Sequence, residues 1–278
     1  MRRAAPVRAG RGGVAMSEQD TGGVVPFQGR ANPRRRAAAE GGGPKYGQVA
    51  NRILRQIEGG VWKPGDQLPS EADLAKSMEV SLGTVQKALQ LLVEDRVVVR
   101  QHGRGTFVGT SRTPEEALRH FRFLSEGGDR LLPVFSTVLG IAETTEPGPW
   151  SHFLKDESSF VTLRRRLSVG GEFDVYSEFY LPGSRVRTLL DIPPDELDGV
   201  LLRDFLAERF NLPTLRMEQR MQCGLIPPRV CNLINLPRGS FGLIWHLLGY
   251  SYRDAPAIFQ RAYVPPTDRA LQIVDAGG

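Results

Sequence analysis

The sequence predicts an α+β protein in which a small helical head with a β-hairpin precedes a larger antiparallel sheet with helices. Three observations predict this fold class. Apolar residues recur at helical spacing between residues 46 and 92. A short hairpin with a glycine-containing turn follows at residues 97–108. Beyond residue 130, β-rich runs alternate with Gly- and Pro-containing turns, which is typical of an antiparallel sheet.

Three helices are predicted in the head. The first covers residues 46–58 and ends at Gly59 and Gly60. The second begins after Ser70, an N-cap residue with Asp73 three positions on. The third follows Ser81, and its inward face carries Val85, Ala88, Leu89 and Leu92. Two short helices joined by a tight turn form a helix-turn-helix, whose second helix fits the major groove of DNA.

A basic β-hairpin is predicted directly after these helices. Its strands are residues 97–100 and 106–108, and residues 102–105, His-Gly-Arg-Gly, supply the turn. Glycine in such a turn lets the backbone approach another molecule closely. The head therefore has the outline of a winged helix-turn-helix.

Charge is unevenly distributed along the chain, which has a net charge of +5. Residues 1–45 hold nine basic and three acidic residues, and residues 46–112 hold nine and seven. The remainder holds 18 basic and 21 acidic residues. This charge distribution is expected for a chain whose N-terminal part contacts phosphates and whose C-terminal part does not.

Composition excludes several other classes of protein. No apolar run approaches the roughly 18 residues that a membrane helix needs, and no apolar segment follows the basic N-terminus as in a secretory signal. Cys223 and Cys231 are too few for a disulfide framework, so free thiols in a cytoplasmic protein are expected. No pattern predicts a metal site or a cofactor.

The head resembles the winged-helix DNA-binding domain of the GntR family of bacterial transcription regulators. The resemblance rests on PGDQLPSEADLA, VSLGTVQKAL and RQHGRGTFV, in that order, within residues 45–109. Family members often carry arginines where this chain has Ala72, Leu82 and Gln86. We therefore expect an unusual operator preference, with Gln86 reading adenine and Leu82 contacting a thymine methyl. Weakened specific binding is the alternative.

The DNA-contacting set implied by this resemblance comes from both helices and the wing. Lys87 is expected at a phosphate, and Arg104 at a phosphate or in the minor groove. The full set is Ser70, Ala72, Ser81, Leu82, Gly83, Thr84, Gln86, Lys87, His102, Gly103 and Arg104.

The C-terminal part of the sequence predicts a sheet, and the central hairpin of this sheet carries charged residues. Residues 160–169 and 172–182 read as its strands, with Gly170 and Gly171 at the turn. Strand periodicity places Arg164 and Arg166 on one face and Arg165 on the other, and Glu178 shares a face with its neighbouring tyrosines. An exposed salt-bridge ladder between the strands is the alternative reading. Further strands are expected at 131–144, 214–226, 240–250 and 257–264, with helices starting near residue 114 and at 150, 199 and 228.

The order of these elements resembles the UTRA effector-binding domain of the HutC subfamily of GntR regulators. The matched segments are RRRLSVGGEFDVYSEFYLP and LPRGSFGLIWHLLGYSYRDAPAIFQRAYV. The resemblance implies a chorismate lyase-like antiparallel sheet domain with helices, a small-molecule effector and a homodimer. The effector-binding residues it implies are Arg164, Arg166, Glu178 and Tyr263. Two arginines favour a carboxylate or a phosphate on the ligand. Ala257 stands where sugar-phosphate-binding members tend to carry an acid.

These features divide the chain into four predicted parts. Residues 1–43 are a disordered basic tail, 44–109 the winged helix-turn-helix, 110–116 a linker, and 117–272 the UTRA-like effector-binding and dimerisation domain.

The expected function is a sequence-specific DNA-binding transcriptional regulator, modulated by a small anionic effector. Repression is the expected sign of regulation, and activation stays open. Its partners would be a double-stranded DNA operator, the effector and a second copy of the chain, with no membrane. Two alternatives stay open. One is a constitutive repressor with a vestigial pocket, of the plasmid-transfer type. The other is a chorismate lyase-like enzyme, which rests on fold analogy alone.

Overall fold

The computed structural model describes residues 44–101, 103–109 and 120–273. The predicted tail and the predicted linker therefore lie outside the described residues. Within the described part of the chain, no helix has the length and apolar character needed to cross a membrane.

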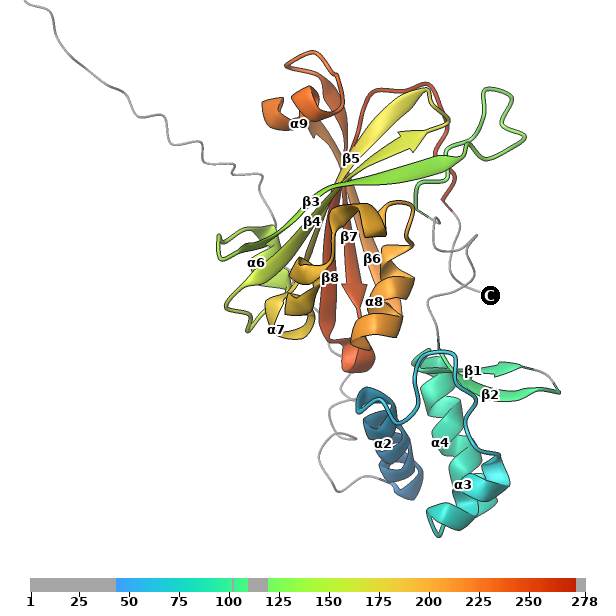
Figure 1. Cartoon of the computed structure of the whole chain (residues 1–278). Coiled ribbons are helices and arrows are strands. Elements are labelled where there is room, and N and C mark those ends of the chain that lie inside the picture. The colour runs from blue at the N-terminus through green and yellow to red at the C-terminus, as the bar shows by residue number, and fades with distance from the viewer. Residues whose placement is uncertain (1–43, 102, 110–119, 274–278) are drawn as a thin grey trace, which may run out of the picture. The chain divides into compact units, whose positions relative to one another are not determined.

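The N-terminal described part is a winged helix-turn-helix, as the sequence predicts. Its helices are α2 (Lys45–Glu58), α3 (Glu71–Ser77) and α4 (Leu82–Glu94). The antiparallel strands β1 (Val98–Gln101) and β2 (Gly105–Val108) form the wing (Figure 1). Hydrogen bonds join Leu68 and Gly65 to the backbone of β2, so the segment before α3 is attached to the wing.

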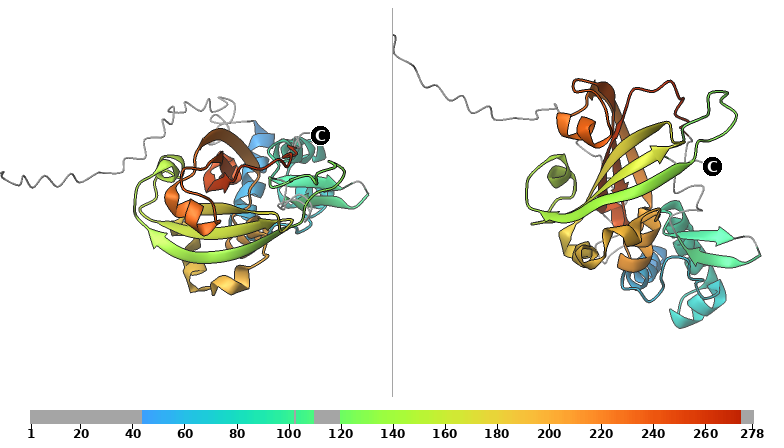
Figure 2. Two further views of the ribbon diagram at one scale, coloured as in Figure 1. Left: turned by 90° about the horizontal axis from the view of Figure 1, so that it is seen from above. Right: turned by 45° about the horizontal axis from the view of Figure 1, so that its top comes forward.

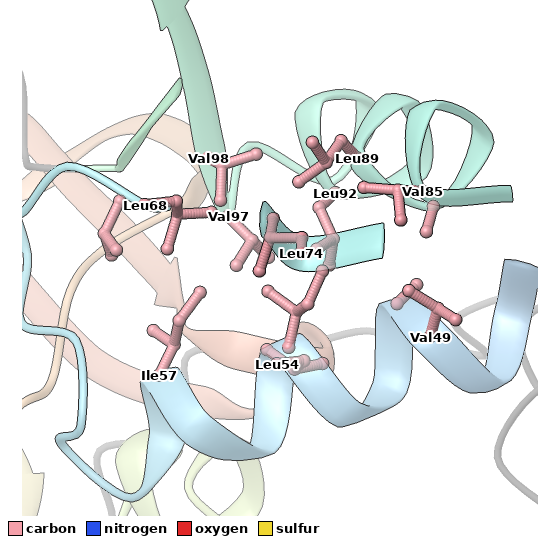
Figure 3. Packing of buried hydrophobic residues seen from close by; sticks show 14 of the residues in the cluster. Val49, Leu54, Ile57, Leu68, Leu74, Val85, Leu89, Leu92, Val97 and Val98 are labelled. Atoms are coloured by element: carbon pink, nitrogen blue, oxygen red, sulfur yellow. The ribbon is translucent and has the colours of Figure 1, made fainter. Parts of the chain in front are cut away.

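A single apolar core holds these elements together (Figure 3). Ile53 and Ile57 of α2, Leu74 of α3, and Val85 and Leu89 of α4 are almost completely buried. Helical spacing brings these side chains to the inner face of each helix. The inward residues predicted for α4, Val85, Ala88, Leu89 and Leu92, are therefore confirmed, and the opposite face of α4 is exposed.

The C-terminal described part contains a six-stranded antiparallel sheet of order β3-β4-β5-β8-β7-β6. The strands are β3 (Val134–Thr144), β4 (Phe160–Val169), β5 (Phe173–Pro182), β6 (Arg216–Leu225), β7 (Phe241–Tyr250) and β8 (Pro256–Val264). Figure 2 shows the strong twist of the sheet. Gly170 and Gly171 both have positive φ and make the predicted turn between β4 and β5.

Helices cover the two faces of the sheet unequally. The α8 face, defined by Leu163, Arg165 and Phe179, packs against α7 (Gly183–Val186), α8 (Leu202–Phe210) and the 3₁₀ helices η1 (Arg187–Asp191) and η2 (Pro194–Leu197). The α9 face, defined by Tyr176, Glu178 and Tyr263, packs against α9 (Pro228–Leu233). At its other end, α6 (Pro149–Phe153) covers Tyr180 and Phe259. The 3₁₀ helix η3 (Tyr252–Asp254) joins β7 to β8.

One predicted element differs from the structure. A helix was expected to start near residue 114, and its first part lies outside the described residues. From residue 120 the chain is not helical. Phe123 and Leu124 instead make isolated β-bridges to Leu271 and Leu131. Phe123 is buried against the sheet, so tertiary packing outweighs the local helical pattern.

Candidate functional site

The outer face of α4 is exposed along its first two turns. Leu82 has 47% of its surface exposed, which is unusual for a large apolar side chain at a helix start. Gly83, Gln86 and Lys87 are also exposed, and Thr84 is half-buried. We call Leu82, Gly83, Gln86 and Lys87 the exposed α4 face. These residues are all members of the predicted DNA-contacting set.

Serine side chains cap both helices of the helix-turn-helix. The Asp73 N–H donates to Ser70 Oγ at 3.1 Å, and Ser70 Oγ donates to the Asp73 carboxylate at 2.6 Å. The Thr84 N–H donates to Ser81 Oγ at 3.3 Å, and the Ser81 and Thr84 hydroxyls lie 2.8 Å apart. The caps satisfy backbone donors that the first turn leaves unpaired. Both serines therefore fix the start of a helix, whatever else they contact.

Glu71, which was not predicted as a site residue, links three elements of the head. Its Oε2 accepts a hydrogen bond from Gln86 Nε2 on α4 at 2.9 Å. Its Oε1 accepts from Arg100 Nη2 on β1, also at 2.9 Å. Glu71 itself is the first residue of α3. This carboxylate thus connects α3, the exposed α4 face and the wing.

The wing tip is built on two glycines. Gly103 and Gly105 have φ values of +70° and +117°. A Cβ on Gly105 would lie 2.7 Å from Gln67 Nε2, which donates to the Arg104 carbonyl at 2.8 Å. Arg104 is exposed, with its guanidinium 5.9 Å from the centre of the Phe107 ring. His102, another predicted contact, lies outside the described residues, and Ala72 is exposed on α3.

A cavity of about 390 Å³ lies on the α8 face of the sheet. Strand residues Arg165, Leu167 and Phe179 form part of its lining, and Arg203 of α8 and Gln260 of β8 also reach it. A cavity of this volume is typical of small-molecule sites. Its lining combines apolar side chains with polar and charged ones, and these include the Asp198 carboxylate.

Two arginines, the buried Arg165 and the half-buried Arg203, bring positive charge to this cavity. Arg165 lies over the Phe179 ring at 4.7 Å, and its Nη1 donates to the Val200 carbonyl at 3.3 Å. Its Nε has no hydrogen-bond acceptor among the described residues. Burial lowers the pKa of Arg165 to about 10. Burial and then the charge of Arg165 lower the pKa of Arg203 to about 9. An anion in the cavity would offset this cost of burying positive charge.

The α9 face carries a separate charged cluster around Glu178, whose exposed fraction is 3%. Its carboxylate accepts hydrogen bonds from Arg229 Nη1 at 2.7 Å, Arg261 Nη2 at 2.8 Å and the Tyr176 hydroxyl at 3.0 Å. Burial raises the pKa of Glu178, but the hydrogen bonds and charges of Arg229 and Arg261 outweigh burial and hold that pKa below its usual range. Glu178 is therefore an ionised partner of two arginines.

The four predicted effector-binding residues share this α9 face. Arg164 pairs with Glu178 across β4 and β5, and Tyr176 pairs with both Arg166 and Tyr263. Arg166 Nε lies 3.9 Å from the Asp174 carboxylate, and Tyr263 is buried. The sheet thus brings together Arg164, Arg166, Glu178 and Tyr263. Their role in binding an effector stays a prediction.

Sequence reasoning missed Arg165, Arg203 and Glu71 as site residues. Strand alternation does place Arg165 opposite Arg164 and Arg166, but it does not say which face borders a cavity. Arg203 follows no motif. The contacts of Glu71 join residues 15 and 29 positions apart, which local spacing does not reveal.

Two family models match the chain. The model of the bacterial regulatory proteins of the gntR family matches residues 45–108. The UTRA domain model matches residues 151–268. These matches cover the winged helix-turn-helix and most of the sheet with its helices.

Several curated regulators are similar to this chain. The HTH-type transcriptional regulator SmoD of Agrobacterium fabrum is 28% identical over 185 residues, covering 66% of this chain and 76% of SmoD. The mannosyl-D-glycerate transport/metabolism system repressor MngR of Escherichia coli is 38% identical over 34% of this chain and 40% of MngR. The histidine utilization repressor of Pseudomonas putida is 41% identical over 25% of this chain and 28% of that protein. The last two matches span less than half the length of those relatives.

Proposed function

Because this chain belongs to the GntR family, with a UTRA domain following its DNA-binding domain, we propose that it is an effector-controlled transcriptional repressor of the HutC type. Its operator would be double-stranded DNA, bound by a homodimer. Its effector would be a small molecule that carries a carboxylate or a phosphate. The observation that carries the effector class is a pair of arginines at one cavity, the buried Arg165 and the half-buried Arg203.

The exposed α4 face would enter the major groove. Leu82 and Gln86 are four residues apart, so they lie one above the other on the helix and can meet neighbouring base pairs. Lys87 would contact a phosphate, and Thr84, Ser70, Ser81, Gly83 and Ala72 would line the same interface. The wing, through Gly103, Arg104 and His102, would track the backbone or the minor groove.

The effector's anionic group would bind between Arg165 and Arg203. A guanidinium offers several donors in a fixed plane, which matches a carboxylate or a phosphate oxygen pair. Among the described residues, the Nε of Arg165 has no acceptor, so it provides one donor for the ligand. Phe179 and Leu167 would contact the apolar part of the ligand. The α9-face set, Arg164, Arg166, Glu178 and Tyr263, is the second candidate location, and the experiment below separates the two.

Effector binding would control DNA binding by a population shift. In a dimer, two recognition helices must meet half-sites about one helical turn apart. An effector that binds one arrangement of the dimer more tightly shifts the population toward it, and only differential affinity can do so. Repression is relieved if the favoured arrangement misaligns the two helices.

DNA binding is tested by a mobility shift of the full chain with the DNA upstream of its own gene. We expect binding that weakens steeply as salt is raised, because Lys and Arg release counterions from phosphates. Arg104→Ala should weaken binding to all sequences alike. Lack of binding to any fragment from the surrounding genome would overturn the proposal.

Effector binding is tested by thermal shift of the full chain against a panel of carboxylates and phosphates. A ligand that raises the melting temperature is then tried on Arg165→Gln and on Arg164→Gln. These neighbours are the same residue type on the same strand but face opposite sides of the sheet. If only Arg165→Gln loses the rise in melting temperature, the result supports effector binding in the cavity. Loss only in Arg164→Gln would place the effector on the α9 face.

The same thermal-shift screen distinguishes an effector-controlled repressor from a constitutive one. If no anionic compound shifts the melting temperature while the chain still binds its operator, the effector part of the proposal fails and the DNA-binding part stands. The enzyme alternative is not proposed, since the matching families and relatives are regulators.

A further inference from the structure

Gln86 on the exposed α4 face is not free to orient its amide at random. Its Nε2 donates to Glu71 Oε2 at 2.9 Å. An ionised carboxylate only accepts hydrogen bonds, so the amide must turn its nitrogen, and not its oxygen, toward Glu71. The chemistry of the partner therefore fixes which end of the Gln86 amide faces inward.

The unused groups of the Gln86 amide form a specific pattern. Glu71 takes one N–H, which leaves the second N–H as a donor and Oε1 as an acceptor. Adenine presents N7 as an acceptor and N6 as a donor in the major groove, whereas guanine presents two acceptors, N7 and O6. A held amide thus matches adenine, and its Oε1 would meet guanine O6 as one acceptor against another.

Arg100 offsets the negative charge of the Glu71 carboxylate. Its Nη2 donates to Glu71 Oε1 at 2.9 Å, so each carboxylate oxygen has one donor. A negative charge facing phosphates would otherwise oppose DNA binding. The ion pair also offsets part of the positive charge that Arg100 would offer to a phosphate.

We infer that Glu71 is a positioning residue that sets base specificity: it holds the Gln86 amide so that the recognition helix selects adenine over guanine at one base pair of each half-site. The inference rests on the proposed function, because it requires α4 in the major groove. It predicts that removing the Glu71 charge relaxes the choice of base without abolishing DNA binding.

The test is selection of operators from randomised DNA by the full chain, followed by affinity measurements with adenine or guanine at the position that Gln86→Ala alters. The wild type should prefer adenine by about tenfold, the range for a bidentate base contact. Glu71→Gln should lower that ratio to about twofold or less, since a glutamine at 71 donates or accepts and allows both orientations of the Gln86 amide. Its affinity for unselected DNA should be equal or higher, since Arg100 is released toward phosphate.

Asp73→Asn is the matched control. It also removes one negative charge from α3 and keeps an oxygen that can accept from Ser70. The adenine preference should persist in this variant. The inference is overturned if wild type and Glu71→Gln show the same ratio of affinities for adenine and guanine. It is also overturned if Glu71→Gln and Asp73→Asn lower that ratio equally. In both cases the selected operator would still support the proposed function. If the wild type selects no sequence, the proposed function itself fails.

Gln86→Arg gives an independent arm that keeps Glu71 in place. Arginine only donates, so it can pair with Glu71 and present its other donors to guanine N7 and O6. The preferred base should change from adenine to guanine. Retained preference for adenine in this variant would contradict the assignment of the position to Gln86, even if Glu71→Gln did not fold.

Discussion

Arg164, Arg165 and Arg166 are chemically identical neighbours on β4, and the pleat of the strand gives them different surroundings. Arg165 faces the cavity and is buried, while Arg166 lies near Asp174 at 3.9 Å with 43% of its side chain exposed. Sequence periodicity predicted this division correctly. It did not predict the cavity, because the loops and α8 that complete its walls follow from tertiary packing.

Glu178 is expected to be a large single contributor to stability. Glu178→Gln would leave Arg229 and the buried Arg261 without their carboxylate, and breaking a buried pair in this way costs about 3–5 kcal/mol. Urea unfolding measures the change. Glu143→Gln, which removes a surface partner of Arg187, should cost no more than about 1 kcal/mol. Equal small losses in both variants would show that Glu178 is not a buried ion-pair partner.

His246 is expected to make stability depend on pH in the mildly acidic range. Burial, followed by the charges of Arg261 and Arg220, lowers its pKa to about 4. An unfolded histidine has a pKa of about 6.5. The unfolded chain therefore binds a proton that the folded chain excludes, so stability is highest above about pH 6.5 and falls as the pH drops toward 4.

Thermal unfolding between these pH values tests this behaviour. His246→Gln should flatten the decline relative to wild type, whereas His152→Gln, an exposed histidine on α6, should leave the decline unchanged. An equal slope in wild type and His246→Gln would contradict the account.

At the scale of elements, most helices and strands could be predicted because their signals are local. Periodicity identified α2 and α4, and β-rich runs between turn signals identified all six strands of the sheet. Cap serines identified the starts of α3 and α4. The helix predicted to start near residue 114 does not continue from residue 120, because Phe123 is held by a long-range β-bridge to Leu271. The exposed α4 face was predicted from the helical spacing of the apolar residues on its inner face. The contacts of Glu71 were not predicted, because they depend on how three elements pack.

The cap of α4 gives a prediction at this scale. Ser81→Ala removes the acceptor for the Thr84 N–H and should lower the free energy of unfolding by about 1 kcal/mol. DNA affinity should fall as well, since Leu82 and Gln86 lie in the first turns of that helix. Ser77→Ala at the end of α3, whose hydroxyl bonds only the Leu74 carbonyl, should change stability by less than about 0.5 kcal/mol. The account predicts the larger loss in Ser81→Ala, and the reverse order would count against it.

At the scale of the whole molecule, the two described parts have different chemistry. The winged helix-turn-helix offers the exposed α4 face and a glycine wing, whereas the sheet domain places Arg165 and Arg203 at a cavity. Net positive charge over residues 1–112 and net negative charge beyond them fit this division. We propose that the first part meets phosphates and base edges and that the second binds a small anion.

The central claim is that the chain reads DNA sequence, and the ratio of its affinities for two DNAs tests it most directly. Fluorescence anisotropy of the full chain would compare a selected operator with a scrambled duplex of equal length and composition at one salt concentration. The account predicts binding to the operator at least about 10³-fold tighter, as specific regulators show. Equal affinity for the two duplexes would contradict it.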